Sequence, residues 1–211
     1  MPLPMVHISV AALLEKRGTV TVADRAAYYL GSIAPDAIHM RKDPAPDAKI
    51  ISHLGARKPE NIGLVSVFRN DFPKYEAAGA SPDFLMGYLV HVLTDLYWKQ
   101  EFYDGFVARY EADPAPAQDV KTAYYNDTDV ADIRLYHTHP DREEIWALLG
   151  TAKGDDLAGL ITGEEADLWN RRTLDWYDVP REYLPVRYAD EESIRAFITA
   201  AAGLIEEYFA R

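Results

Sequence analysis

One apolar helix, predicted over residues 81–110, constrains the fold more than any other part of the chain. Ser81 and Pro82 are typical of a helix start, because serine caps the first turn and proline fits the first helical position. Between residues 84 and 96, apolar side chains cover most of the helix circumference, which predicts a helix that is buried on all sides. Such a helix must lie at the centre of the fold, with other elements packed around it.

The rest of the chain favours further helices. Helical patterns occur over residues 4–17, 25–34, 59–78, 117–136, 141–149, 163–175 and 190–210, whereas few segments alternate as strands do. Residues 35–58 show little apolar periodicity and predict a long loop, a kind of segment that is often functional. A chain of 211 residues with 48% hydrophobic residues can form one sizeable core. We therefore expect a single all-α domain over residues 1–211, with about seven helices.

Composition excludes several classes of protein. The chain has no cysteine, so it can form neither disulfides nor thiolate metal sites. We expect no signal peptide and no transmembrane helix, because the N-terminus lacks a basic region and no stretch of about 18 apolar residues occurs; a cytoplasmic location is the expectation. The net charge of −12 argues against a stable nucleic-acid complex.

The acidic surplus lies after residue 60. Residues 1–60 contain 8 basic and 6 acidic residues, whereas residues 61–211 contain 14 and 28. An anionic ligand can therefore approach the first segment, although acidic residues that serve solubility explain the same pattern.

Two ionisable residues interrupt the apolar helix. His91 and Asp95 are four residues apart and share one helix face, and Gly87 leaves space beside them one turn earlier. A buried carboxylate is costly without a counter-charge. Lys99 can supply this charge in a His–Asp–Lys ladder, and a metal cation is the alternative.

The other histidines extend the metal hypothesis. They are His7, His39, His53, His137 and His139. Asp36 and His39 lie in the segment GSIAPDAIHMR, and His53 lies in KIISHLG. Together with the pair on the apolar helix and His7 from the first helix, they predict a metal site of imidazole and carboxylate ligands. Zinc accepts both ligand types, and carboxylate-rich sites also suit manganese or iron.

Three segments carry a resemblance to a known family. YLGSIAPDAIHMR, ISHLG and GYLVHVLTDLYW resemble motifs of the zinc-dependent phospholipase C superfamily, which also includes single-strand-specific nucleases. More narrowly, they resemble its small intracellular bacterial members. The resemblance covers residues 1–105, and the order of the motifs is more specific than any one of them. It implies an all-α fold around a metal cluster and the hydrolysis of phosphate esters.

The resemblance also implies a ligand set. Asp36, His53, His91 and Asp95 match the ligands of one metal, and His7 matches a ligand of a second metal that Asp95 would bridge. Asp36 is also the catalytic candidate, because it can orient the attacking water.

The chain departs from the family pattern at two places and matches a third in spacing. The characterised secreted enzymes begin with a tryptophan that binds metal, whereas this chain begins MPLPMVH. They also carry a histidine where this chain has Lys99 and Glu101. Their third metal site needs a later His-x-x-x-Glu, which His139 and Glu143 match in spacing. These departures favour one or two metals.

The substrate side of the site has three candidates. His39, Arg41 and Lys42 follow Asp36 closely and can hold a phosphate, although Arg41 and Lys42 also fit a solvated loop pair. The sequence therefore predicts a zinc-dependent hydrolase of a small anionic phosphate ester. The alternative is a non-catalytic metal-binding or structural protein that retains the fold with a reduced metal site. A helical phosphohydrolase of the His-Asp dipeptide type is disfavoured, because no such dipeptide occurs.

Overall fold

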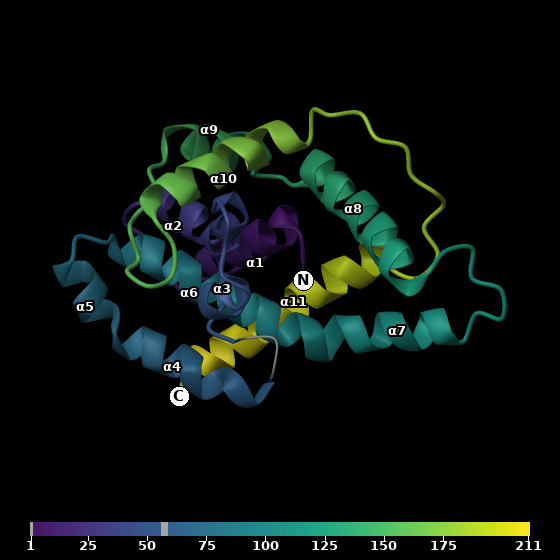
Figure 1. Ribbon diagram of the computed structural model, residues 1–211, viewed down its shortest axis with the longest axis horizontal. Helices are drawn as coiled ribbons and strands as arrows, with labels where there is room; N and C mark the ends of the chain where they lie inside the picture. Colours follow the sequence, from purple (N-terminus) through teal and green to yellow (C-terminus); the bar gives the residue numbers. More distant parts are fainter. Residues whose placement is uncertain (1, 56–58) are drawn as a thin grey trace.

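The observed helices confirm the predicted all-α class (Figure 1). The computed structural model describes residues 2–55 and 59–211. In chain order, the α-helices are α1 Pro4–Lys16, α2 Arg25–Gly31, α3 Ala48–Ser52, α4 Ile62–Asn70, α5 Phe72–Ala77, α6 Pro82–Trp98, α7 Asp104–Glu111, α8 Val120–Thr138, α9 Arg142–Thr151, α10 Gly163–Trp176 and α11 Glu191–Phe209. Two 3₁₀ helices, η1 (Ala34–Met40) and η2 (Pro59–Asn61), and the π-helical turn η3 (Lys99–Tyr103) connect some of them.

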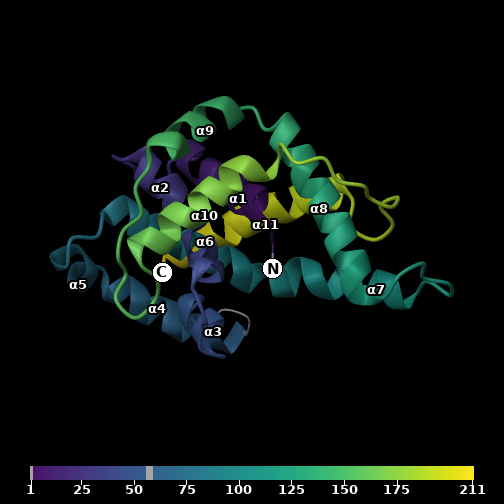
Figure 2. The same cartoon turned by 45° about the horizontal axis from the view of Figure 1, so that its top comes forward.

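Helix α6 lies at the centre of the molecule, as its apolar circumference predicts. From Phe84 to Trp98, every side chain except those of Met86 and Tyr97 is buried. Helices α1, α2, α4, α5 and α11 pack against it. On the other side of α1, α8 packs along that helix, and α10 packs against η1. Both views place α5 and α7 at opposite ends of the molecule (Figures 1 and 2).

Helices α2 and α6 cross with their backbones in direct contact. A β-carbon at Gly87 would lie 2.1 Å from the carbonyl oxygen of Tyr28, and one at Gly31 would lie 2.2 Å from that of Phe84. The prediction that Gly87 leaves open space is therefore wrong, because the backbone of α2 fills that space. This crossing brings the end of α2 next to the histidine of α6.

Local signals in the sequence explain several helix ends. Asp24, Ser81 and Asp190 cap α2, α6 and α11, since each side chain accepts a hydrogen bond from a backbone N–H group of the first turn. Gly18 follows α1 with a φ of 72°, a conformation that glycine adopts without strain.

The described residues form eleven α-helices, so the expected number of about seven is too low. Residues 35–58, predicted as a loop, contain η1 and α3, while residues 56–58 lie outside the described part of the chain. The predicted helix 59–78 divides before Pro73, which fits a first helical turn but cannot continue a preceding helix. None of the helices described is long and apolar enough to cross a membrane.

Candidate metal centre

Four elements bring five of the predicted ligands together. His7 comes from α1, Asp36 from η1, His53 directly follows α3, and His91 and Asp95 come from α6. All five side chains are buried. Their donor atoms form two groups, in each of which the atoms lie within 4.8 Å of one another: His7 with His91 and Asp95, and Asp36 with His53 and His91. Each group can hold a metal ion.

Many polar atoms of this cluster have no hydrogen-bond partner among the described residues. They are both ring nitrogens of His7, Nε2 of His53 and of His91, Oδ1 of Asp36, and both carboxylate oxygens of Asp95. Buried polar atoms are almost always paired, and each unpaired one costs about 1–3 kcal/mol. Their concentration in one place, with only nitrogen and oxygen donors, fits a divalent cation.

Backbone carbonyls orient two of the imidazoles. The Nδ1 of His91 lies 2.8 Å from the carbonyl oxygen of Ser32, and the Nδ1 of His53 lies 3.0 Å from that of Lys49. Because a carbonyl only accepts hydrogen bonds, Nδ1 of His91 carries the proton and donates it, whereas Nδ1 of His53 also lies 2.8 Å from the hydroxyl of Ser52. In the neutral tautomer, Nε2 then presents its lone pair to the cluster, as it does in histidines that bind metals.

The carboxylates face these lone pairs. His53 Nε2 lies 3.3 Å from Asp36 Oδ1 and 3.6 Å from Asp95 Oδ2. The other oxygen of Asp95, Oδ1, lies 3.7 Å from Nε2 of His7, whose ring stacks on that of His91 with centroids 3.6 Å apart. A cation between these atoms would offset the repulsion between lone pairs that face one another.

The protonation states suit such a cation. Burial lowers the pKa of His7 well below its ordinary value, and the proximity of His91 lowers it further. Burial also lowers the pKa of His91. For Asp36, burial alone would raise the pKa, but His53 and His91 outweigh this effect and hold the pKa well below its ordinary value. At neutral pH, His7 and His91 are therefore neutral and Asp36 is ionised, which are the forms that bind metals.

Lys99 does not form the alternative ladder with Asp95. Its ammonium group pairs with Asp104, and both of these side chains are exposed. Lys99 begins the π-helical turn η3, directly after α6. The His–Asp–Lys ladder, one of the two alternatives for this pair, is therefore not formed among the described residues, and Glu101 lies exposed in η3.

Of the three predicted phosphate contacts, one faces the cluster. His39 Nε2 lies 3.6 Å from Asp36 Oδ1. Arg41 instead forms a bidentate ion pair with Glu165, at 2.6 and 2.9 Å, and thereby ties η1 to α10. Lys42 is exposed. The guanidinium of Arg41 thus serves the packing of two elements, which residue spacing within one loop does not reveal.

The predicted pair for a third metal lies apart from the buried groups. His139 directly follows α8, and its Nδ1 accepts a hydrogen bond from the backbone of Asp141. The Glu143 side chain is 90% exposed and lies beside Arg142. Among the described residues, neither His139 nor Glu143 belongs to a group that can hold a metal. This pair adds no ligand to the cluster.

Lys49 is the residue near the cluster that the sequence analysis missed. Its Nζ lies 3.7 Å from Asp36 Oδ1 and 2.6 Å from Nε2 of His39. It belongs to α3, in a segment predicted as a loop, so no helical face indicated its direction. Lys49 brings a positive charge to the mouth of the candidate centre.

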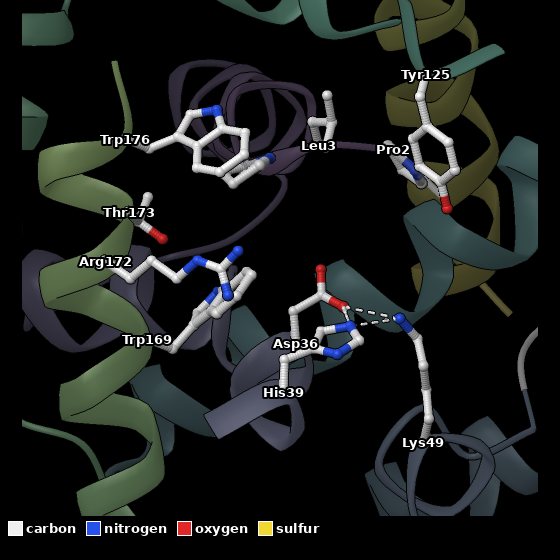
Figure 3. Close-up of a pocket in the computed structure, with 11 residues that line it drawn as sticks. Pro2, Leu3, Asp36, His39, Lys49, Tyr125, Trp169, Arg172, Thr173 and Trp176 are labelled. Carbon is white, nitrogen blue, oxygen red and sulfur yellow. Dashed lines mark hydrogen bonds and ion pairs between the residues drawn. The ribbon is translucent and has the colours of Figure 1, made fainter. Parts of the chain in front are cut away.

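Two cavities give access to the carboxylates. One, of about 380 Å³, reaches Asp36 and is lined by side chains of η1, α3, α8 and α10 (Figure 3). The other, of about 470 Å³, reaches Asp95 and is lined by residues of α6, η3 and α8. Lys49 and Tyr125 line both cavities. A small molecule can therefore approach the buried cluster from two directions.

The ion pair of Arg41 predicts a stability effect. We expect Arg41→Met to lower the free energy of unfolding by about 1–2 kcal/mol, because it leaves the partly buried Glu165 without its charged partner. Lys42→Met, at the exposed neighbouring position, should change it by less than about 0.5 kcal/mol. Urea unfolding measures both, and equal stability of the two variants would contradict the structural role of Arg41.

Comparisons with known proteins give no information about the function. No family model, no curated protein and no solved structure matches the chain. The geometry itself establishes an all-α fold and a buried cluster of histidines and aspartates that can bind a metal ion.

Proposed function

We propose that the protein is a metal-dependent phosphoesterase that hydrolyses a small anionic phosphate ester. Its metal ligands are His7, Asp36, His53, His91 and Asp95. The observation that carries the proposal is the set of unpartnered, buried imidazole and carboxylate atoms at the inner ends of two cavities. The resemblance of three segments to the zinc-dependent phospholipase C superfamily supports the same reaction class.

Zinc is the proposed metal. Neutral imidazole and carboxylate ligands without thiolate suit zinc, and the carboxylates also accept manganese or iron. The two oxygens of Asp95 face different histidines, His7 and His53, which supports a bridging role between two ions. We therefore propose one or two ions, with His91 close to both.

The chemistry is divided between the cation and the protein. A divalent cation supplies Lewis acidity, which lowers the pKa of a water molecule and offsets the charge of the phosphoryl oxygens. Asp36 is ionised and faces a cavity, so its carboxylate can orient the attacking water and accept its proton. As the water oxygen bonds to phosphorus, the bond to the leaving alcohol oxygen breaks, and this oxygen takes up the proton that the water gave to Asp36.

Lys49 and His39 act on the substrate in this proposal. Both line the cavity beside Asp36, and the ammonium group of Lys49 can donate hydrogen bonds to the phosphoryl oxygens. His39 keeps the role predicted for it from the sequence, and Lys49 takes the role predicted for Arg41 and Lys42. Burial of the ligands excludes bulk water from the cluster and strengthens these interactions.

A substrate panel tests the proposal. Protein stripped with chelator and reloaded with zinc, manganese or no metal is assayed on bis(p-nitrophenyl) phosphate, p-nitrophenyl phosphate, a phospholipid and single-stranded nucleic acid. We expect metal-dependent hydrolysis of the small diester, reduced at least about 100-fold in His91→Ala. His137→Ala, at an exposed position outside the cluster, should retain the activity of the wild type. Bound metal with no turnover above His91→Ala would instead indicate a non-catalytic metal-binding protein.

A further inference from the structure

The cavity that reaches Asp36 has an aromatic side. Trp169 and Trp176 of α10 form this side (Figure 3). Asp36, His39 and Lys49 also line the cavity. The close-up shows the two tryptophans across the cavity from Lys49 and from Tyr125 of α8, and the ring centroid of His39 lies 5.8 Å from that of Trp169.

One face of α10 builds the aromatic side. Trp169, Arg172, Thr173 and Trp176 follow one another at intervals of three, one and three residues, so they share a helix face. This face points into the cavity. The sequence analysis predicted a helix here but gave no function to it, because nothing in its local pattern shows that α10 packs against η1.

Arg172 lies between the two tryptophans. Its guanidinium carbon is 5.3 Å from the ring centroid of Trp169 and 5.7 Å from that of Trp176. Figure 3 shows the guanidinium extending from α10 toward Asp36 and His39. Stacking on two indoles orients this cation toward the polar part of the cavity, where a phosphoryl oxygen can accept its hydrogen bonds.

We infer that this cavity binds a phosphate ester that carries a planar aromatic ring. The ring packs against Trp169 and Trp176, and the phosphoryl group lies toward Arg172 and Lys49. The position of the phosphoryl group rests on the proposed function. Aromatic side chains stack on planar rings of any identity, whereas a saturated group of the same size gains only the burial of its surface. A cavity of about 380 Å³ suits one small ligand.

Binding of phosphonates tests this inference without any turnover, because hydrolysis of esters does not break a carbon–phosphorus bond. The probes are phenylphosphonate, cyclohexylphosphonate and methylphosphonate, titrated calorimetrically into the metal-loaded protein. We expect phenylphosphonate to bind about tenfold more tightly than cyclohexylphosphonate, and methylphosphonate to bind most weakly.

Variants of α10 assign the preference to this cavity. Trp169→Leu and Trp176→Leu should remove the preference for the phenyl ring, and Trp169→Phe should retain it even if a leucine variant is poorly folded. Arg172→Met should weaken the binding of all three phosphonates at least about tenfold. Arg171→Met is the matched control, since Arg171 is exposed on the same helix and does not line the cavity, and it should bind as the wild type does.

Several outcomes would overturn the inference: equal affinity for the phenyl and cyclohexyl probes, a ring preference that persists in both leucine variants, or no phosphonate binding at all. The proposed function fails separately. Ring-specific binding without hydrolysis of any ester would refute the phosphoesterase alone, whereas metal-dependent hydrolysis without a ring preference would refute this inference alone.

Discussion

Without metal, the Asp95→Asn variant is expected to be at least as stable as the wild type, whereas with zinc it is expected to be less stable. With excess chelator, the variant should be at least as stable as the wild type, because the substitution removes a buried negative charge whose oxygens have no hydrogen-bond partner among the described residues. With zinc at 1,000 times its dissociation constant, the wild type should gain about 4 kcal/mol in free energy of unfolding. The variant should gain far less, because Asp95 belongs to one of the two groups that can hold a metal and also faces His53 of the other.

Thermal and urea unfolding, each with and without zinc, measure this reversal. Lys99→Ala is the matched control one turn after Asp95, and it should change stability by less than about 0.5 kcal/mol, since Lys99 and its partner Asp104 are both exposed. A structural role for Asp95 predicts a different result. If Asp95→Asn destabilised the protein equally with zinc and with chelator, the cluster would be a buried polar network and not a metal centre.

The candidate ligands could be predicted from the sequence because helix spacing or the order of their segments singles them out. His91 and Asp95 stand out in an apolar helix at a spacing that fixes their common face. Asp36 and His53 fall in short segments whose order along the chain resembles a family pattern. The structure brings these residues together with His7, although they come from elements that are far apart in the sequence. The metal itself, and the way the ligands divide between ions, stay predictions.

The features that could not be predicted from the sequence depend on packing between elements that are far apart in the chain. Lys49 and Arg172 reach the candidate centre from α3 and α10, and Arg41 turns away from it toward Glu165. None of these three positions differs in local pattern from an ordinary surface cation. The break of the predicted helix 81–110 at η3 depends on packing in the same way, and Lys99 in η3 pairs with Asp104.

The space expected beside Gly87 is the clearest example of packing that the sequence does not reveal. The sequence shows that a side chain is missing there, but it does not show what takes its place. The backbone of α2 occupies this space and positions the Ser32 carbonyl 2.8 Å from Nδ1 of His91. Close packing of two helix backbones therefore orients a proposed metal ligand. A substitution at this crossing should affect folding and metal binding together.

We expect Gly87→Ala to lower the free energy of unfolding by at least about 3 kcal/mol, despite the higher helix propensity of alanine. The new β-carbon would lie 2.1 Å from the carbonyl oxygen of Tyr28, so α2 must move away. Zinc affinity of the folded fraction should fall about 10–100-fold, because the movement takes the Ser32 carbonyl away from His91.

Gly203→Ala is the control. This residue lies within α11, where a β-carbon meets nothing within 4 Å, and the substitution should raise stability by up to about 1 kcal/mol. Urea unfolding and zinc titration of both variants measure these effects. Unchanged stability of Gly87→Ala would show that the two helices do not cross as closely as described, whereas lost stability with unchanged zinc affinity would show that the Ser32 carbonyl does not orient His91.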